Sequence, residues 1–200
     1  MRAAAIRKGE TLLEPSAGTG ALAAFAARAG ATLLLNEIDP FRQRLLRALF
    51  GGEVTGHDGE HIDDLLQTPV LPDVVVMNPP FASSVDRSRD KHIAAKHLIA
   101  AAKRLAPGGR LVAIMPPGFT SERDAAHWSR ARARARGLLT PRLALTMPGQ
   151  VYRKLGTSVE TQLMVFDKVQ EDGEMIRVPV RDLDEALAYV DAVAATRPEM

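Results

Sequence analysis

The sequence predicts an α/β fold in which a doubly wound, mostly parallel sheet carries helices on both faces. Short apolar runs alternate with helical patterns along most of the 200 residues, which is the order that a parallel sheet with crossover helices requires. The run from Val74 to Met77 is continuously apolar, as expected of a strand buried on both faces. A glycine-rich turn separates the first apolar run from an alanine-rich helical segment, which indicates a tight strand-to-helix connection.

The individual elements follow from local patterns in chain order. We expect strands at 11–14, 32–36, 53–55, 73–77 and 110–115, and helices at 21–29, 40–50, 59–66 and 92–105. A helix at 121–136 with Ser121 as its N-cap, strands at 142–146 and 161–168, and a helix at 182–195 complete the prediction. We therefore expect a single domain over residues 1–200, with a core at about 9–168 and a helical extension at about 174–200.

Composition excludes several classes of protein. A 200-residue chain with 46% hydrophobic residues can bury a substantial core. It contains no uninterrupted apolar stretch of the roughly 18 residues that a membrane span needs. It has no cysteine, which excludes disulfides and thiolate metal sites and is expected for a cytoplasmic protein. The formal net charge of +2 permits binding to nucleic acid without indicating it.

Asn78, Pro79, Pro80 and Phe81 end the buried apolar run and are the most informative residues of the chain. The two prolines stop the strand, because neither can donate a ladder hydrogen bond, and Pro79 keeps Asn78 out of the helical conformation. The stiff turn then presents an amide, a backbone carbonyl and an aromatic ring at the carboxyl edge of the sheet. The amide and the carbonyl can accept the two hydrogens of a planar amine, and the ring can stack on a base. We therefore expect these four residues to form the catalytic site.

The glycine turn after the first strand predicts a cofactor site, and two kinds of cofactor fit it. Gly18 and Gly20 permit a tight turn and a close approach of a ligand to the backbone N–H groups of the next helix. The spacing satisfies a dinucleotide fingerprint with Glu37 as ribose ligand, but a cationic cofactor with a ribose would use the same residues. Glu14 favours the cation, because a carboxylate repels a pyrophosphate and attracts a sulfonium or an ammonium group.

Both motifs resemble those of the class I S-adenosylmethionine-dependent amino-methyltransferases, the group that includes the DNA adenine-N6 methylases. Residues 12–20 resemble motif I of that family and residues 78–81 resemble its motif IV, in the order of the gamma type. Residues 145–168, with Tyr152, Gly156 and Thr157, resemble a later region of the gamma-type enzymes more loosely. The resemblance implies a seven-stranded Rossmann-like sheet with an antiparallel edge strand, and S-adenosylmethionine as cofactor. It assigns cofactor binding to Glu14, Pro15, Ser16, Ala17, Gly18, Gly20, Glu37, Ile38, Asp58 and Asn78.

The resemblance also implies individual roles for the acidic residues. Glu14 would lie near the positive end of the cofactor, Glu37 would accept both ribose hydroxyls, and Ile38 would pack on the adenine face. Asp58 would accept a hydrogen bond from the exocyclic amine of the adenine, or would cap the helix that follows it. For Asp39 we favour a capping role, with a proline at the first helical position.

The remaining histidines and arginines carry weaker predictions. His57 and His61 lie four residues apart, but no third ligand accompanies them, and we predict no metal site. We expect the helical histidines to be solvated, namely His92, His97 and His127. Four arginines alternate with alanines near the end of the helix at 121–136, where they could complement the helix C-terminus or bind phosphate: Arg130, Arg132, Arg134 and Arg136.

These assignments predict methyl transfer to an exocyclic amino nitrogen, with adenine N6 in DNA as the favoured target and RNA as the next. The alternatives are guanine-N2 methylation of ribosomal RNA, glutamine-N5 methylation of a protein, in which tyrosine usually replaces Phe81, and an inactive cofactor- or DNA-binding module of a larger protein. We find neither the segment that precedes motif I in gamma-type enzymes nor a target-recognition domain of the usual size. We therefore expect a recognition domain or subunit outside this sequence.

Overall fold

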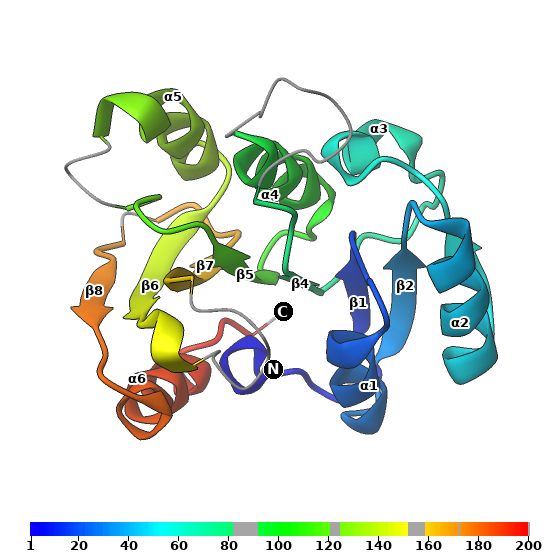
Figure 1. The fold of residues 1–200 in the computed structure, drawn as a ribbon, viewed down its shortest axis with the longest axis horizontal. Helices are drawn as coiled ribbons and strands as arrows, with labels where there is room; N and C mark the ends of the chain where they lie inside the picture. The colour runs from blue at the N-terminus through cyan, green and yellow to red at the C-terminus, as the bar shows by residue number, and fades with distance from the viewer. Residues whose placement is uncertain (82–91, 121–124, 152–158, 172, 200) are drawn as a thin grey trace.

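A computed structural model of the chain describes residues 1–81, 92–120, 125–151, 159–171 and 173–199, with only the backbone at 125–127. A mixed sheet crosses the molecule and carries helices on both faces (Figure 1). Its strands lie in the order β3-β2-β1-β4-β5-β7-β6-β8, and β7 alone runs antiparallel to its neighbours among these eight. The strands are β1 (Thr11–Glu14), β2 (Thr32–Asn36), β3 (Val54–Thr55), β4 (Val74–Met77), β5 (Arg110–Met115), β6 (Thr140–Met147), β7 (Thr161–Asp167) and β8 (Ile176–Pro179).

The helices are α1 (Ala21–Arg28), α2 (Pro40–Phe50), α3 (Ile62–Leu65), α4 (Ile93–Arg104), α5 (Ala125–Arg136) and α6 (Leu183–Ala195), with short 3-10 helices η1 (Arg2–Ala4) and η2 (Gly59–His61). Helices α1 to α5 lie between successive strands of the chain, whereas η1 precedes the first strand and α6 follows the last, and together they cover both faces of the sheet. In Figure 1, α3, α4 and α5 line one face of the sheet, and η1, α1 and α6 line the other. None of the helices in the described ranges is both long and apolar enough to cross a membrane.

The predicted fold class is confirmed, with four differences in its elements. The sheet has eight strands, because β8 pairs in parallel with β6 within the expected helical extension, before the predicted helix at 182–195. The antiparallel strand was expected at the edge, but β7 lies between β5 and β6, and β8 forms the edge. The predicted helix at 59–66 is divided into η2 and α3. Strand β6 begins at Thr140, two residues early, and tolerates Pro141 because the register shifts there. The expected N-cap Ser121, and Tyr152, Gly156 and Thr157 of the looser resemblance, lie outside the described residues.

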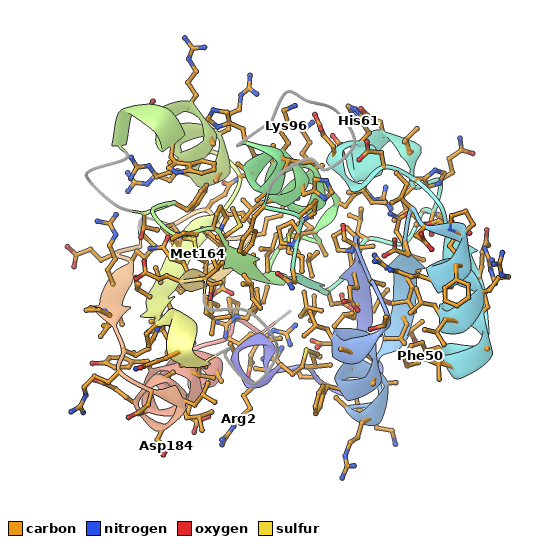
Figure 2. The ribbon with its side chains drawn as sticks, in the orientation of Figure 1. Arg2, Phe50, His61, Lys96, Met164 and Asp184 are labelled. Carbon is orange, nitrogen blue, oxygen red and sulfur yellow. The ribbon has the colours of Figure 1, made fainter. Side chains whose placement is uncertain are left out.

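Two hydrophobic layers follow from the alternation of side chains along the strands. Leu13 and Val75 face the layer formed with α3, α4 and α5, whereas the preceding residues Leu12 and Val74 face the layer formed with η1, α1 and α6. All four side chains are fully buried. Side chains fill the space between the sheet and its helices on both sides, with Met164 of β7 among them (Figure 2).

The C-terminal segment is tied to the sheet by a fully buried arginine. Arg110 of β5 forms an ion pair with Asp167 of β7, at 2.7 Å between Nε and Oδ1. Its Nη1 also donates hydrogen bonds to the carbonyls of Ala3 in η1 and Val193 in α6. Since a buried charge without partners is costly, these bonds fix η1 and α6 over the centre of the sheet. Residues 174–199 contribute both the edge strand β8 and the covering helix α6.

Candidate active site

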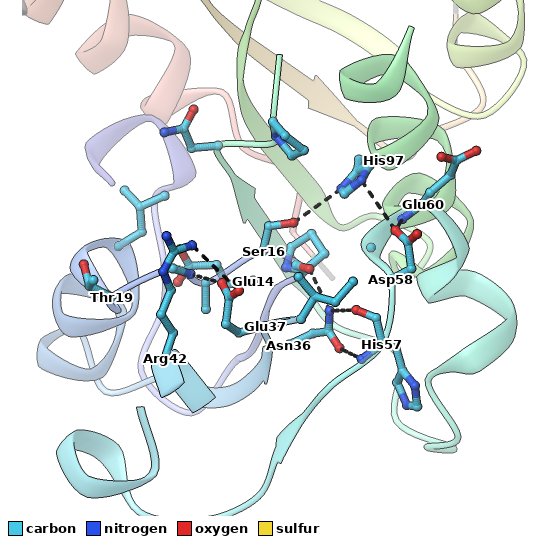
Figure 3. Close-up of a pocket in the computed structure, with 18 of the residues that line it drawn as sticks. Glu14, Ser16, Thr19, Asn36, Glu37, Arg42, His57, Asp58, Glu60 and His97 are labelled. Atoms are coloured by element: carbon cyan, nitrogen blue, oxygen red, sulfur yellow. Dashed lines mark hydrogen bonds and ion pairs between the residues drawn. The ribbon is translucent and has the colours of Figure 1, made fainter. Parts of the chain in front are cut away.

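The loops that follow the first four strands meet at one edge of the sheet and line a cavity of about 900 Å³ (Figure 3). The strand order reverses between β1 and β4, and open α/β sheets bind ligands at such a switch point, beyond the carboxyl ends of the strands. The cavity is lined by Glu14, Pro15, Ser16, Ala17, Gly18, Thr19, Ala21, Leu22, Asn36, Glu37, Ile38, Arg42, His57, Asp58, Gly59, Glu60, Asn78, Pro80, Ile93, His97 and Ile114.

Nine of the ten residues predicted to bind the cofactor line this cavity, and Gly20 does not. Gly20 precedes α1 with a φ of 85°, a conformation that favours glycine. A Cβ atom at this position would lie 2.6 Å from the ring of Phe50 and 2.9 Å from Leu46, both in α2. The sequence therefore requires glycine here for the packing of α1 against α2, whereas Gly18 forms part of the cavity wall.

Glu37 holds the glycine turn in place. Its carboxylate is almost fully buried and accepts hydrogen bonds from the backbone N–H of Gly18 at 2.7 Å and of Asp39 at 2.9 Å. A guanidinium nitrogen of Arg42, a residue that no sequence motif indicated, lies 3.9 Å from Oε1. The capping role of Asp39 is confirmed, since its side chain accepts from the backbone N–H of Arg42 and Pro40 opens α2.

Asn36 forms hydrogen bonds that connect three of the loops, and sequence reasoning missed this residue. Its Nδ2 donates to the carbonyls of Pro15 at 2.9 Å and His57 at 2.8 Å. Its Oδ1 accepts from the hydroxyl of Thr55 and from the backbone N–H of His57. A buried amide satisfies its hydrogen bonds or destabilises the fold, so these bonds fix the loops after β1, β2 and β3 relative to one another. The only sequence signal was an amide at the end of a buried strand.

Glu14 is a buried carboxylate with an unsatisfied oxygen. It is only 2% exposed, and its Oε2 has no hydrogen-bond partner among the described residues. Burial raises the pKa of this carboxyl group to about 8, a hydrogen bond from the backbone of Ala23 opposes that rise, and the negative charge of Glu37 adds to it. Buried polar atoms normally have hydrogen-bond partners, so an unpaired carboxylate oxygen in a cavity wall indicates a binding site for a cationic or hydrogen-donating ligand. The carboxyl groups in the cavity wall therefore fit a positively charged cofactor.

Asp58 both caps a helix and lines the cavity. Its Oδ1 accepts from the backbone N–H of Glu60 at 3.0 Å, which confirms the capping role at η2. The side chain is still 52% exposed and belongs to the cavity wall, so capping does not withdraw the carboxylate from the site. Its binding to a cofactor amine stays a prediction.

His97 of α4 was expected to be solvated, and this prediction is wrong. The residue is 4% exposed and lines the cavity, where its Nδ1 lies 3.3 Å from the hydroxyl of Ser16. The sequence contained a signal, because His97 lies on the same helical stripe as the buried residues Ala94 and Ala101. His92 is also partly shielded, with its ring 5.2 Å from that of Trp128.

The proline turn divides its residues between the cavity and the core. Asn78 is exposed and lines the cavity together with Pro80. Pro79 is buried, and Phe81 packs half-buried against the hydrophobic layer that contains α4. Stacking of Phe81 on a substrate base stays a prediction. Across the described ranges, no three histidine, aspartate or glutamate side chains gather closely enough to hold a metal ion.

The strand order, the antiparallel β7 and the cavity beyond β1 and β4 define a fold similar to that of the class I S-adenosylmethionine-dependent methyltransferases. A putative enzyme of this class from Listeria monocytogenes superposes with a TM-score of 0.70 at 14% identity, over 96% of this chain and 67% of that protein. No protein-family model and no curated protein sequence matches the chain.

Modification subunits of type I restriction systems share the same fold. A putative one from Vibrio vulnificus superposes with a TM-score of 0.69 at 15% identity, over 92% of this chain and 49% of that subunit. The methyltransferase subunit from Streptococcus thermophilus gives a TM-score of 0.69 at 16% identity, over 98% of this chain and 49% of the subunit. The chain thus spans about half the length of these two proteins, and at such identities the similarity concerns the fold.

Proposed function

We propose that the chain is an S-adenosylmethionine-dependent N-methyltransferase that acts on an exocyclic amino nitrogen, with adenine N6 in DNA as the favoured target. One observation carries the proposal. The buried, unsatisfied carboxylate of Glu14 and the exposed amide of Asn78 lie at the ends of the adjacent strands β1 and β4 and line the same cavity. A group that attracts a cation and a group that accepts an amine hydrogen thus share one site, as methyl transfer from a sulfonium to an amine requires.

The hydrogen bonds of the glycine turn favour this cofactor over a nicotinamide dinucleotide. In a dinucleotide site, the backbone N–H groups of such a turn bind a pyrophosphate. Here the N–H of Gly18 already donates to the carboxylate of Glu37, and a second carboxylate, Glu14, lies in the same cavity. The Glu37 carboxylate would repel a pyrophosphate, and Glu14 would add to this repulsion once it is ionised, whereas a bound cation would favour its ionised form. The carboxylate oxygens of Glu37 can each accept a further hydrogen bond, and they would bind the two hydroxyls of the ribose. The side chain of Ile38, which is 61% exposed, would cover the adenine.

The bound cofactor would supply an activated methyl group, so the residues of this chain have to position the acceptor nitrogen. The side-chain oxygen of Asn78 would accept one amino hydrogen, and the carbonyl of Pro79 would accept the other. These bonds favour a pyramidal nitrogen and stabilise the positive charge that develops on it. The amide cannot act as a base at neutral pH, and the proton therefore leaves to solvent. A base within a duplex would have to flip out of the stack to enter the cavity.

DNA is favoured because modification subunits of type I restriction systems are among the solved structures with this fold. Those subunits are about twice as long as this chain, and this difference supports target recognition by a further domain or subunit. Contacts from this chain alone would be phosphate contacts, which carry no sequence information. The exposed Arg130, Arg134 and Arg136 of α5 are candidates for them.

Thermal unfolding with two ligands tests the cofactor assignment. We expect S-adenosylhomocysteine to raise the melting temperature, because a ligand that binds the folded state stabilises it, and we expect NAD to leave it unchanged. Glu37→Ala should weaken calorimetric affinity for S-adenosylhomocysteine on the order of 10- to 100-fold, since it removes charge-assisted hydrogen bonds. Glu53→Ala, which changes an exposed glutamate outside the cavity, is the matched control and should bind normally. Stabilisation by NAD in place of S-adenosylhomocysteine would refute the assignment.

A further inference from the structure

His97 contacts two walls of the cavity at once (Figure 3). Its Nδ1 lies 3.3 Å from the Ser16 hydroxyl in the turn after β1, and its Nε2 lies 3.9 Å from Oδ1 of Asp58 in the loop after β3. Gly59 permits this arrangement, because a Cβ atom at that position would meet the imidazole 2.7 Å from Nδ1. The loop after β3 can therefore pack directly on the ring only because residue 59 is glycine.

The surroundings of the ring favour one neutral tautomer. Burial lowers the pKa of His97, with Asp58 and Glu60 opposing this effect and His61 and Lys96 adding to it, so the ring is neutral near pH 7. The carboxylate of Asp58 would repel a lone pair on Nε2 but attracts a proton there, so the tautomer with the proton on Nε2 is favoured. With the proton on Nε2, the Ser16 hydroxyl donates to Nδ1.

The Nε2–H group then lacks a partner. Nε2 is buried and has no hydrogen-bond partner among the described residues, and 3.9 Å to Asp58 is too long for a hydrogen bond. Leaving a buried donor unpaired costs about 1–3 kcal/mol. His97 is thus a nearly fully buried residue of the cavity wall, and its unsatisfied Nε2 lies beside the carboxylate of Asp58, which lines the same cavity.

We propose that His97 selects the purine of the cofactor, donating a hydrogen bond beside the Asp58 carboxylate so that the pair accepts a 6-aminopurine and rejects a 6-oxopurine. This inference rests on the proposed function. A 6-aminopurine offers an amino donor next to the ring acceptor N1, which complements a carboxylate next to an N–H donor. A 6-oxopurine offers a carbonyl acceptor next to an N1–H donor, which places acceptor against acceptor and donor against donor. Sites built on such hydrogen bonds discriminate strongly, because the mismatched ligand leaves buried groups unpaired.

Calorimetric titration with S-adenosylhomocysteine and its deaminated analogue S-inosylhomocysteine tests the proposal. We expect the wild-type chain to prefer the adenosine compound, and His97→Phe to reduce the ratio of the two affinities by about tenfold, the value of one hydrogen bond. His97→Gln should reduce the ratio as well, through tighter binding of the inosine compound, because its amide can rotate to present either group. His61→Phe changes an exposed histidine in the neighbouring η2 and should keep the wild-type ratio.

The outcomes separate this inference from the proposed function. If the wild-type chain binds neither compound, the proposed function and the inference fail together. If it binds S-adenosylhomocysteine but shows no preference, or if the two His97 variants keep the wild-type ratio, the inference alone is overturned. The glutamine variant keeps the test decisive should the phenylalanine variant fail to fold.

Discussion

Replacing Asn78 with alanine should lower the rate of methyl transfer by about 10²–10³, the cost of removing one oriented hydrogen-bonding group at a developing charge. The affinity for S-adenosylhomocysteine should stay close to that of the wild-type chain. Asn78 is exposed at the end of β4, whereas the carboxylates expected to hold the cofactor follow β1, β2 and β3. Single-turnover rates, with affinities measured on the same preparations, would show this separation.

Asn78→Asp is the informative companion to the alanine variant. The aspartate keeps an acceptor oxygen at the same position, so it should retain much more activity than alanine if the role of Asn78 is to accept an amino hydrogen. Turnover by the alanine variant at the wild-type rate would show that the proline turn is only structural. A large loss of cofactor affinity in the alanine variant would show that Asn78 acts on the cofactor and not on the substrate.

Replacing Glu14 with glutamine should remove a large pH dependence of stability. The folded protein raises the pKa of Glu14 from its ordinary value of 4.5 to about 8, so the folded state holds this proton more tightly than the unfolded chain. The stabilisation is complete below about pH 4.5 and is lost as the pH rises through about 8. The loss is on the order of 5 kcal/mol in the free energy of unfolding, because a tenfold change in proton affinity is worth about 1.4 kcal/mol.

The glutamine side chain has the same shape and no charge, so Glu14→Gln should not lose this stability on going from pH 5 to pH 9. Denaturant unfolding of both proteins from pH 5 to pH 9 measures how the difference between their free energies of unfolding changes with pH. The other titrating groups are the same in both proteins, so their contributions cancel in this difference. If the free energies of unfolding of the two proteins changed with pH in the same way, Glu14 would not be a buried carboxyl group without a compensating partner. In the wild-type chain, affinity for S-adenosylhomocysteine should also rise with pH up to about 8, because the ionised carboxylate attracts the ammonium group of the ligand. In the glutamine variant this rise should be much smaller.

Local chemistry explains why much of the site could be predicted from the sequence. Consecutive prolines after an apolar run end a strand regardless of its tertiary contacts. The Asp39-Pro40 pair begins a helix for similarly local reasons, since aspartate caps the first turn and proline fits the first helical position. The carboxyl ends of parallel strands share one edge, so identifying the strands was sufficient to bring Glu14, Glu37 and Asn78 to one cavity.

The parts that were missed depend on contacts between distant segments. His97 is an active-site candidate only because α4 turns it toward the loops after β1 and β3, and Asn36 acts through bonds to residues about 20 positions away. Gly20 has a local glycine signature, but its purpose is the packing of α1 against Phe50. Strand β8 is only four residues long, lies mostly exposed at the edge of the sheet and ends at Pro179, so its pairing with β6 is what makes it a strand.

Methyl transfer to nucleic acid tests the central claim most directly. The purified chain would be incubated with tritiated S-adenosylmethionine and unmethylated DNA, with ribosomal RNA and protein acceptors in parallel and Asn78→Ala as the inactive control. The labelled product would then be digested to nucleosides and separated. We predict label in N6-methyladenine from DNA with the wild-type chain and a loss of that label with the variant. Label on RNA or on protein instead would correct the substrate, and label on a carbon or oxygen atom, or equal label with Asn78→Ala, would contradict the amino-methyltransferase assignment itself.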